Sequence, residues 1–277
     1  MAEELGLHSL AVADASTGRQ RPKFQTYEGH YFLNVYAVRL DVATGELVTS
    51  EVAAFITSTA LITVRKDDSL SIDGLLARWD DHADLTRHGV GALLHGLLDF
   101  VVDGHFDAVR ALDDQIELLE DLLFDDRPHD RDVQRRSFQL RKSLVSLRRV
   151  VLPMREVVTV IQHRRMDGKT AVELDPVYAD LYDHVLRVSE WTESLRDMVT
   201  TVFETNLSLQ DARLNIVMKK LTGWAAIIAV PTAITGFYGQ NVIYPGVETV
   251  GGFVASTVII TALVILLYVM FKRRDWL

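Results

Sequence analysis

The sequence contains no cysteine, and only six of its 277 residues are proline. A disulfide framework is therefore excluded, and the composition suits a reducing compartment. Neither a glycine-rich phosphate loop, nor a catalytic triad, nor a zinc-finger spacing occurs. The formal net charge of −9 disfavours nucleic acid as a partner. The chain is thus predicted to be neither an enzyme nor a nucleic-acid-binding protein, and no cofactor is expected.

The opening residues, MAEELGLHSL, have neither a basic region nor an apolar region, so no cleaved signal peptide is expected. Charged residues are also nearly missing from the last part of the chain. Between Lys220 and Lys272, Glu248 is the only one. Because the basic residues after Lys220 outnumber the acidic ones by one, residues 1–220 carry a net charge of about −10. An acidic body is therefore joined to an apolar tail.

Two apolar runs fill this uncharged region. They read LTGWAAIIAVPTAITGFYG (221–239) and GFVASTVIITALVILLYVMF (252–271). Each approaches the roughly 20 residues that cross a bilayer as a helix. We therefore expect a first transmembrane helix at 221–241, an outer loop at 242–251, a second transmembrane helix at 252–271 and a basic tail at 272–277.

Basic residues flank the two runs on one side only. Lys219 and Lys220 precede the first run, a basic cluster at 272–274 follows the second, and the loop between them has no positive charge. By the positive-inside rule both termini are cytoplasmic and the loop lies outside. The chain is predicted to be a two-span protein of the cell membrane whose bulk is in the cytoplasm.

The acidic body is predicted to be α+β. Val, Leu, Ile and aromatic residues between 31 and 66 indicate strands, with ATGEL as a turn, so we assign 1–88 to an α/β domain. Apolar residues then recur at helical spacing over about 90–124 and 133–165, which predicts a helical hairpin at 89–175. A third helix begins near Pro176, and no further Pro or Gly occurs before Leu221. Its part at 176–220 is expected to be a stalk that continues into the first span.

The first span is richer in small and hydroxylated residues than the second. It carries Thr222, Thr232 and Thr235, whereas the second span is mostly Val, Ile and Leu. Such residues line a polar pore, but they equally permit close packing of helices in lipid. Two helices cannot enclose a water-filled path, so a pore would require several copies of the chain. Composition alone leaves pore lining and simple packing open.

The run PTAITGFYGQN, followed by a short loop, a second span and the ending FKRRDWL, resembles the CorA family of divalent-cation channels. The hallmark of that family is Tyr-Gly-Met-Asn at the end of the first of two spans. Here Tyr238, Gly239, Gln240 and Asn241 stand in its place, so glutamine replaces methionine. The stalk segment, with YDH at 182–184, LRD at 195–197 and NIVMK at 215–219, is also similar to that family. The likeness is specific over about 175–277 and looser before it.

The resemblance implies a homopentamer with an α/β cytoplasmic funnel, which takes up magnesium passively and responds to internal magnesium. It marks Asn215, Met218 and Thr232 as pore-facing, and Met218 with Leu221 as a hydrophobic constriction that can gate by dewetting. Residues at steps of three or four share one face of a helix. The expected pore-lining face is Asn215, Met218, Leu221, Ala225, Ala229, Thr232 and Gly236.

The GQN sequence also has a physical reading as a selectivity filter. Magnesium holds its water shell tightly, and neutral oxygens can hydrogen-bond to those waters while binding weakly enough for the ion to leave. Asn241 would supply a ring of amide oxygens, and Gly239 would present its carbonyl to the axis. Gln240 would add a second polar ring or point away. Glu248, once per chain, would concentrate cations at the outer mouth.

The resemblance also implies a cytoplasmic magnesium sensor. Asp180 matches, by its spacing back from GQN, a stalk aspartate of that sensor, although an ordinary exposed charge is an equal alternative. The second carboxylate is expected among Asp67, Asp68 and Asp73. His82, His88, His95 and His105 have no tight ligand spacing and are expected to be surface or satisfied core residues.

Three functions remain open at this point. The leading hypothesis is a channel for magnesium, with cobalt and nickel as further cargo. A proton-coupled zinc transporter of the ZntB type would use the same scaffold. A non-conducting membrane-anchored scaffold is the third, and the threonines of the first span together with GQN argue against it.

Overall fold

The computed structural model describes residues 5–18, 20–67, 70–81, 83–123, 130–164, 172–240, 246 and 249–277. It divides the chain into two compact units, Met1–Glu204 and Thr205–Leu277. The division falls inside one helix, α6 (Asp175–Tyr238), which belongs to both units. The predicted segment boundaries at 220/221 and 241/242 therefore stay predictions.

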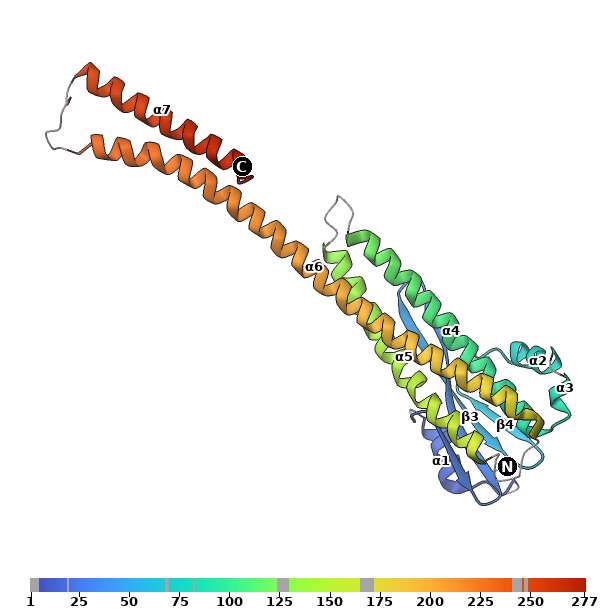
Figure 1. Ribbon diagram of the computed structural model, residues 1–277. Coiled ribbons are helices and arrows are strands. Elements are labelled where there is room, and N and C mark those ends of the chain that lie inside the picture. The colour runs from blue at the N-terminus through green and yellow to red at the C-terminus, as the bar shows by residue number, and fades with distance from the viewer. Residues whose placement is uncertain are drawn as a thin grey trace. The chain divides into compact units, whose positions relative to one another are not determined.

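A four-stranded antiparallel sheet forms the centre of the first unit (Figure 1). Its strands follow the chain in space: β1 (Lys23–Tyr27), β2 (His30–Asp41), β3 (Glu46–Ile56) and β4 (Leu61–Arg65). Gly29 and Gly45 occupy the turns on either side of β2 with φ of +86° and +69°, a conformation in which glycine pays no steric penalty. The strands expected between 31 and 66 are present, whereas β1 lies outside that stretch.

Different helices pack on the two faces of the sheet. Leu33 on β2 is paired with Ala54 on β3, and Val35 with Val52; all four are buried in the main core beneath the long helices. On the other face Phe32, Ala53 and Phe55 pack against the short helix α1 (Ser9–Thr17). The alternation of side chains along each strand produces these two cores.

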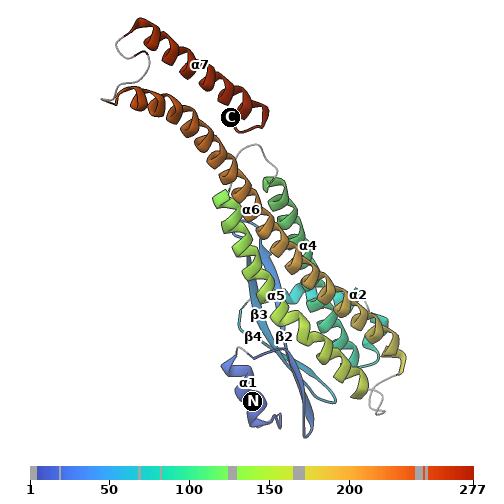
Figure 2. The same cartoon turned by 60° about the vertical axis from the view of Figure 1, so that its left-hand side comes forward.

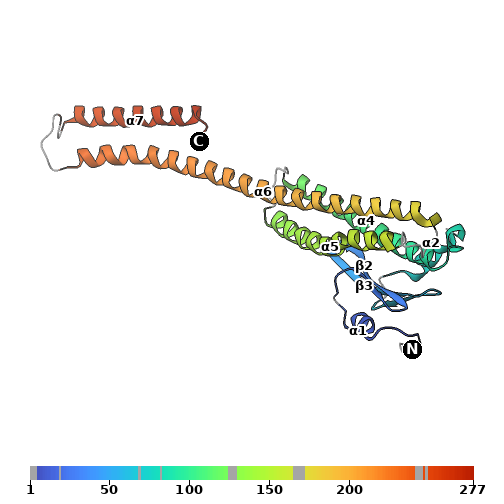
Figure 3. The ribbon, with the colours of Figure 1, turned by 60° about the horizontal axis from the view of Figure 1, so that its bottom comes forward.

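The helices follow the sheet in sequence. After α2 (Ile72–Asp81) and α3 (Ala83–Thr86) come the long helices α4 (Val90–Leu123) and α5 (Asp130–Arg164), and a short 3-10 turn (Val172–Leu174) leads into α6. Figures 2 and 3 show α4 and α5 over the sheet and the first part of α6 on the outer side of these two helices. The three long helices predicted from periodicity are confirmed, and the whole arrangement is α+β.

The first part of α6 closes the main core with one continuous stripe. Its buried apolar residues are Tyr178, Leu181, Val185, Val188, Leu195, Val199 and Val202. The buried Thr192 stands between Val188 and Leu195, so buried positions recur at steps of three and four. A stripe about 100° wide is what a helix buries against its neighbours.

The second unit consists of the rest of α6 and of α7 (Val250–Arg273), which runs back alongside it (Figure 3). Thr249 caps α7, because its hydroxyl oxygen accepts a hydrogen bond from the Gly252 N–H at 3.1 Å. None of the residues of α7 is buried within this chain. Both helices are long and apolar enough to span a membrane.

Candidate ion pathway

The predicted pore-lining residues share one uncovered face of α6. From Asn215 to Gly236 all seven are exposed, and Met218 and Leu221 expose 57% and 62% of their surface. Nothing lies within 4 Å of the place where a side chain would begin at Gly236. Within the second unit this face is therefore free to meet water or further copies of the chain.

The opposite face of α6 is the covered one. Gly223 and Ile227 are buried, and Val230 and Ile234 are half-buried. Gly223, Ile227 and Ile234 lie two residues from the nearest members of the exposed series, which corresponds to a rotation of about 200° around the helix. The exposed series from Asn215 to Gly236 is thus not on the side that the second unit buries, although that side also includes a small residue, Gly223. Pore lining by this face stays a prediction, because residues outside it, such as Ile228, are exposed as well.

The hydroxyl groups of this helix are arranged as acceptors. Thr232 Oγ1 donates to the Ile228 carbonyl at 3.1 Å, and Thr235 Oγ1 donates to the Pro231 carbonyl at 2.8 Å. A hydroxyl has a single hydrogen, so once that is engaged its outward side can only accept. The waters around a hydrated cation point their hydrogens outward and need acceptors. The exposed hydroxyl of Thr232 therefore matches the outer surface of a hydrated ion.

The helix ends next to the GQN sequence. The Gly239 N–H still donates to the Thr235 carbonyl at 2.9 Å, and the Gln240 N–H donates to the Phe237 carbonyl at 3.3 Å. A Cβ at Gly239 would lie 3.1 Å from the Thr235 carbonyl oxygen, and its φ is not positive. Glycine is thus favoured here by the close approach of that oxygen and not by a left-handed backbone. Asn241 and Glu248 lie outside the described residues.

A second candidate site lies in the first unit, where α4 and α6 meet. Asp99, Asp103 and His184 bring one ligand atom each within 4.8 Å of one another. Asp180, the predicted sensor residue, is 70% exposed at its side chain, and its carboxylate lies 3.7 Å from His184 Nε2. The other ring nitrogen, Nδ1, is buried without a hydrogen-bond partner.

Arg78 of α2 already binds this cluster. Its guanidinium forms ion pairs with both Asp99 and Asp103. Burial by itself would lower the pKa of Arg78, but the hydrogen bonds and charges of Asp103 and Asp99 outweigh it and raise that pKa. The two carboxylates are therefore balanced by a cation from the same chain. The Asp-x-x-x-Asp spacing at 99–103 is the sequence signal that indicates two acids on one face of a helix.

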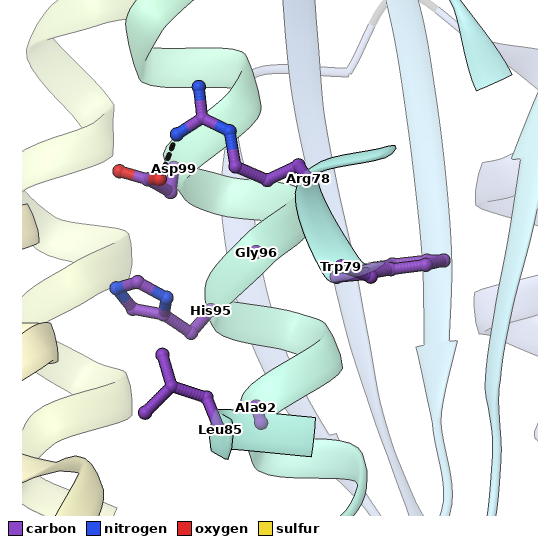
Figure 4. A pocket seen from close by; sticks show the side chains of 7 residues that line it. All are labelled: Arg78, Trp79, Leu85, Ala92, His95, Gly96 and Asp99. Carbon is purple, nitrogen blue, oxygen red and sulfur yellow. Dashed lines mark hydrogen bonds and ion pairs between the residues drawn. The ribbon is translucent and has the colours of Figure 1, made fainter. Parts of the chain in front are cut away.

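The space beside the cluster is too small for an organic ligand. Figure 4 shows Arg78 reaching Asp99 above a cavity of about 20 Å³, which has room for about one water. Trp79 lies across Gly96, where an added Cβ would come within 2.5 Å of the indole nitrogen. That nitrogen donates to the Leu93 carbonyl at 3.2 Å, so α2 is seated on α4 in a fixed position.

The other predicted sensor and histidine positions have different roles. Asp67 accepts a hydrogen bond of 2.6 Å from Ser50, Asp73 lies in the first turn of α2, and Asp68 is outside the described residues. His105 is completely buried, and burial lowers its pKa to about 4. Its Nε2 lies 2.8 Å from the Tyr36 carbonyl oxygen, so the neutral ring donates there and is a core residue.

Comparison with known proteins identifies relatives of the whole chain. The family model described as CorA-like Mg²⁺ transporter protein matches residues 1–273. The cobalt/magnesium transport protein CorA of Thermotoga maritima is 29% identical over 277 residues, which cover 99% of this chain and 78% of the relative.

Two solved structures share the fold. The complete structure of the CorA magnesium transporter from Methanocaldococcus jannaschii superimposes with a TM-score of 0.82 at 24% identity, covering 100% of this chain and 86% of that one. The cytoplasmic domain of ZntB from Vibrio parahaemolyticus gives 0.61 at 14% identity, covering 76% of this chain and 82% of that domain. At these identities the likeness concerns the fold alone.

Proposed function

Because this chain belongs to the family of CorA-like Mg²⁺ transporter proteins, we propose that it is a homopentameric channel for divalent cations, with magnesium as its principal cargo. Proteins of this family transport ions and are not enzymes, and the chain is a membrane protein with two candidate spans. The pore is formed by five copies of α6, and α7 stands outside them toward lipid. Cobalt and nickel are further cargo, and the transport is passive.

The uncovered face of α6 carries this proposal. It combines the exposed Thr232 hydroxyl with several small side chains, and it lies away from the side that the second unit buries. A fivefold arrangement places equivalent residues of the five copies in rings around one axis. Rings of neutral acceptors hold hydrated magnesium without stripping its waters, which that ion releases reluctantly.

Two levels of this pore have distinct roles. Met218 and Leu221 form the constriction, where apolar side chains exclude water and thereby block ions. Asn241 forms the selectivity filter with Gly239 and Gln240, and Glu248 raises the concentration of cations at the outer mouth. The exposure of Met218 and Leu221 within a single chain supports the first role.

Both termini lie in the cytoplasm. Lys219, Lys220 and the cluster 272–274 are the basic residues at the two ends of the spans, and such residues stay on the cytoplasmic side. The chain has no native thiol, so a thiol reagent can react only with a cysteine that is introduced. An impermeant reagent should label Val247→Cys in intact cells and leave Asp275→Cys unlabelled; labelling of the second variant alone would reverse the orientation.

Magnesium inside the cell closes the channel through the first unit. Asp180 is exposed and stands next to His184, which in turn adjoins Asp99 and Asp103. A divalent ion at Asp180 would relieve the repulsion among acidic bodies in the assembly and favour the closed state. Because Arg78 pairs with Asp99 and Asp103, Asp180 is the carboxylate of this group that is most open to an ion from solution.

The alternative function, a proton-coupled zinc transporter, would use the same residues but would require a proton gradient. Flux into liposomes separates the alternatives: magnesium, cobalt, nickel and zinc are offered in turn, with and without an imposed pH gradient and with magnesium on the inner side. We expect uptake of magnesium and cobalt without a gradient, inhibition by internal magnesium, and loss of that inhibition in Asp180→Ala. Zinc uptake that depends on the pH gradient would favour the transporter, and absence of any uptake would favour the scaffold.

A further inference from the structure

The residues after α7 form a closed turn. The Trp276 N–H donates to the Phe271 carbonyl at 3.0 Å, and the Asp275 N–H donates to the Lys272 carbonyl at 3.4 Å. The backbone of Asp275 is in the left-handed conformation, with φ of +54°. This pair of hydrogen bonds around one left-handed residue is a Schellman motif, in which glycine is usual and aspartate is tolerated.

The apolar contact that accompanies such a motif is also present. The rings of Trp276 and Phe271 stack with centroids 5.5 Å apart and planes inclined by 13°. The turn is therefore held by two backbone hydrogen bonds and by an aromatic pair. Both Trp276 and Leu277 are half-buried, although the three basic residues just before the turn are exposed.

The turn directs Leu277 against Gly223 of α6. A Cβ built at Gly223 would lie 3.3 Å from Leu277 Cδ2 and 3.7 Å from the Trp276 carbonyl oxygen. Gly223 is buried although it stands in the interior of a helix, where glycine costs about 1 kcal/mol relative to alanine. Its missing side chain makes the notch that receives Leu277.

We propose that Trp276 and Leu277 are positioning residues for the gate, and that they fasten α7 to α6 at Gly223. The inference rests on the proposed channel function. Gly223 follows Leu221 by two residues and Met218 by five, so a contact at Gly223 limits the movement of the constriction. An apolar constriction blocks ions only while its side chains stay close enough to exclude water. Loosening the contact therefore raises the leak through the closed channel.

A cross-link tests the contact without any reference to transport. Leu277 Cγ, which a cysteine replaces with sulfur, lies 3.6 Å from the Cβ position at Gly223. Because the chain has no other cysteine, Gly223→Cys with Leu277→Cys should form one disulfide on oxidation. We expect it within single chains, seen as an unchanged monomer mass on denaturing gels with both thiols blocked. Disulfide-linked dimers, or free thiols in the folded assembly, would contradict the contact.

Flux measurements test the consequence. Full-length protein in liposomes with high internal magnesium should leak about fivefold more in Leu277→Ala than in the wild type, a ratio that corresponds to about 1 kcal/mol. Asp275→Val should act likewise, because a β-branched residue opposes the left-handed turn, whereas Asp275→Gly is the matched control and should leave the leak unchanged. Oxidising the cysteine pair should keep the leak low.

The outcomes separate the two proposals. Wild-type leak in both Leu277→Ala and Asp275→Val, with assembly verified by size, would overturn the positioning role. Equal leak in Asp275→Gly and Asp275→Val would mean that the conformation of the turn does not control the leak. No uptake by the wild type under any condition would overturn the channel function and the positioning role with it, whereas the cross-link would still report on the contact.

Discussion

The two parts of α6 bury their apolar side chains to very different degrees. Before Thr205, Leu181 and Val185 expose 1% or less of their surface, whereas beyond it Leu214 and Leu221 expose 63% and 62%. The amino acids are of the same kind and belong to one helix. The first part finds its partners on α4, α5 and the sheet, whereas the second exposes a surface much larger than soluble proteins leave uncovered. In the proposed assembly, lipid and further copies of the chain would cover this surface.

The polar groups differ in the same way. In the first unit charges are paired within the chain, as in the ion pairs Lys66–Glu51 and Arg148–Glu193. In the described spans the polar groups are neutral hydroxyls that donate to their own helix, as Thr232 and Thr235 do. A substitution in the first unit should therefore change stability, and one in the second should change transport.

The largest effect is expected at the filter. Asn241→Ala removes five amide oxygens from a pentamer, and we expect divalent uptake to fall about 100-fold while the protein still assembles. Gly239→Ala should lower uptake as well, because its methyl group would press on the Thr235 carbonyl oxygen at 3.1 Å. Gln240→Met should retain flux and, if the side chain faces the ion, change the preference among magnesium, cobalt and zinc. Normal selective uptake by Asn241→Ala in liposomes would remove the filter from this position.

The next largest effect is expected at the constriction. Met218→Asp places a charge in the apolar constriction and lets water enter it. We therefore expect the leak of cations to rise about tenfold. Ile228→Asp serves as a comparison on the same helix, because Ile228 is equally exposed but lies outside the predicted face; it should impair insertion rather than raise the leak. Unchanged flux in well-assembled Met218→Asp would count against this face.

A pair of identical substitutions measures the contrast within α6 directly. Leu181→Ala opens a cavity in the main core and should lower the free energy of unfolding by about 2–5 kcal/mol. Leu214→Ala removes the same atoms from an exposed position, and the unfolding of the first unit should change by less than about 0.5 kcal/mol. Urea unfolding in detergent, followed by circular dichroism, gives both values. Equal losses would mean that the two parts are buried alike in the assembly.

The smallest effect is a pH dependence of the first unit. Burial lowers the pKa of His105 to about 4, below the usual 6.5 of an unfolded chain, so the unfolded state takes up the proton first. The stability that the neutral ring contributes is present above pH 6.5 and is lost as the pH falls toward 4, with about 2 kcal/mol gone at pH 5.

Replacing the ring tests this assignment. His105→Gln keeps a donor for the Tyr36 carbonyl but does not titrate, so the stability of this variant should depend less on pH between 7 and 5. The free energy of unfolding of both proteins is measured at the two pH values. The same slope in both would mean that other groups produce the pH dependence.

Much of the architecture could be predicted because its signals are local. The helical spacing of apolar residues predicted α4, α5 and α6, and two uncharged runs predicted the spans, since each signal lies within one stretch of chain. β1 was missed because KFQTY is short and only partly buried, and α1 because SLAVADAST has no clear apolar stripe. The GQN sequence predicted the family, which the match over residues 1–273 confirms.

The sequence by itself predicted the strands after β1, the long helices, their order and the two candidate spans, whereas the filter at the end of the first span stays a prediction. Only the tertiary structure decided which residues meet across long stretches of chain. Asp99 and Asp103 join His184 more than 80 residues later, and Leu277 finds the notch at Gly223. Periodicity cannot predict such pairs, because a helical pattern specifies which side of a helix is apolar and not which partner covers it. For the same reason, composition left pore lining and packing open, and pore lining stays a prediction.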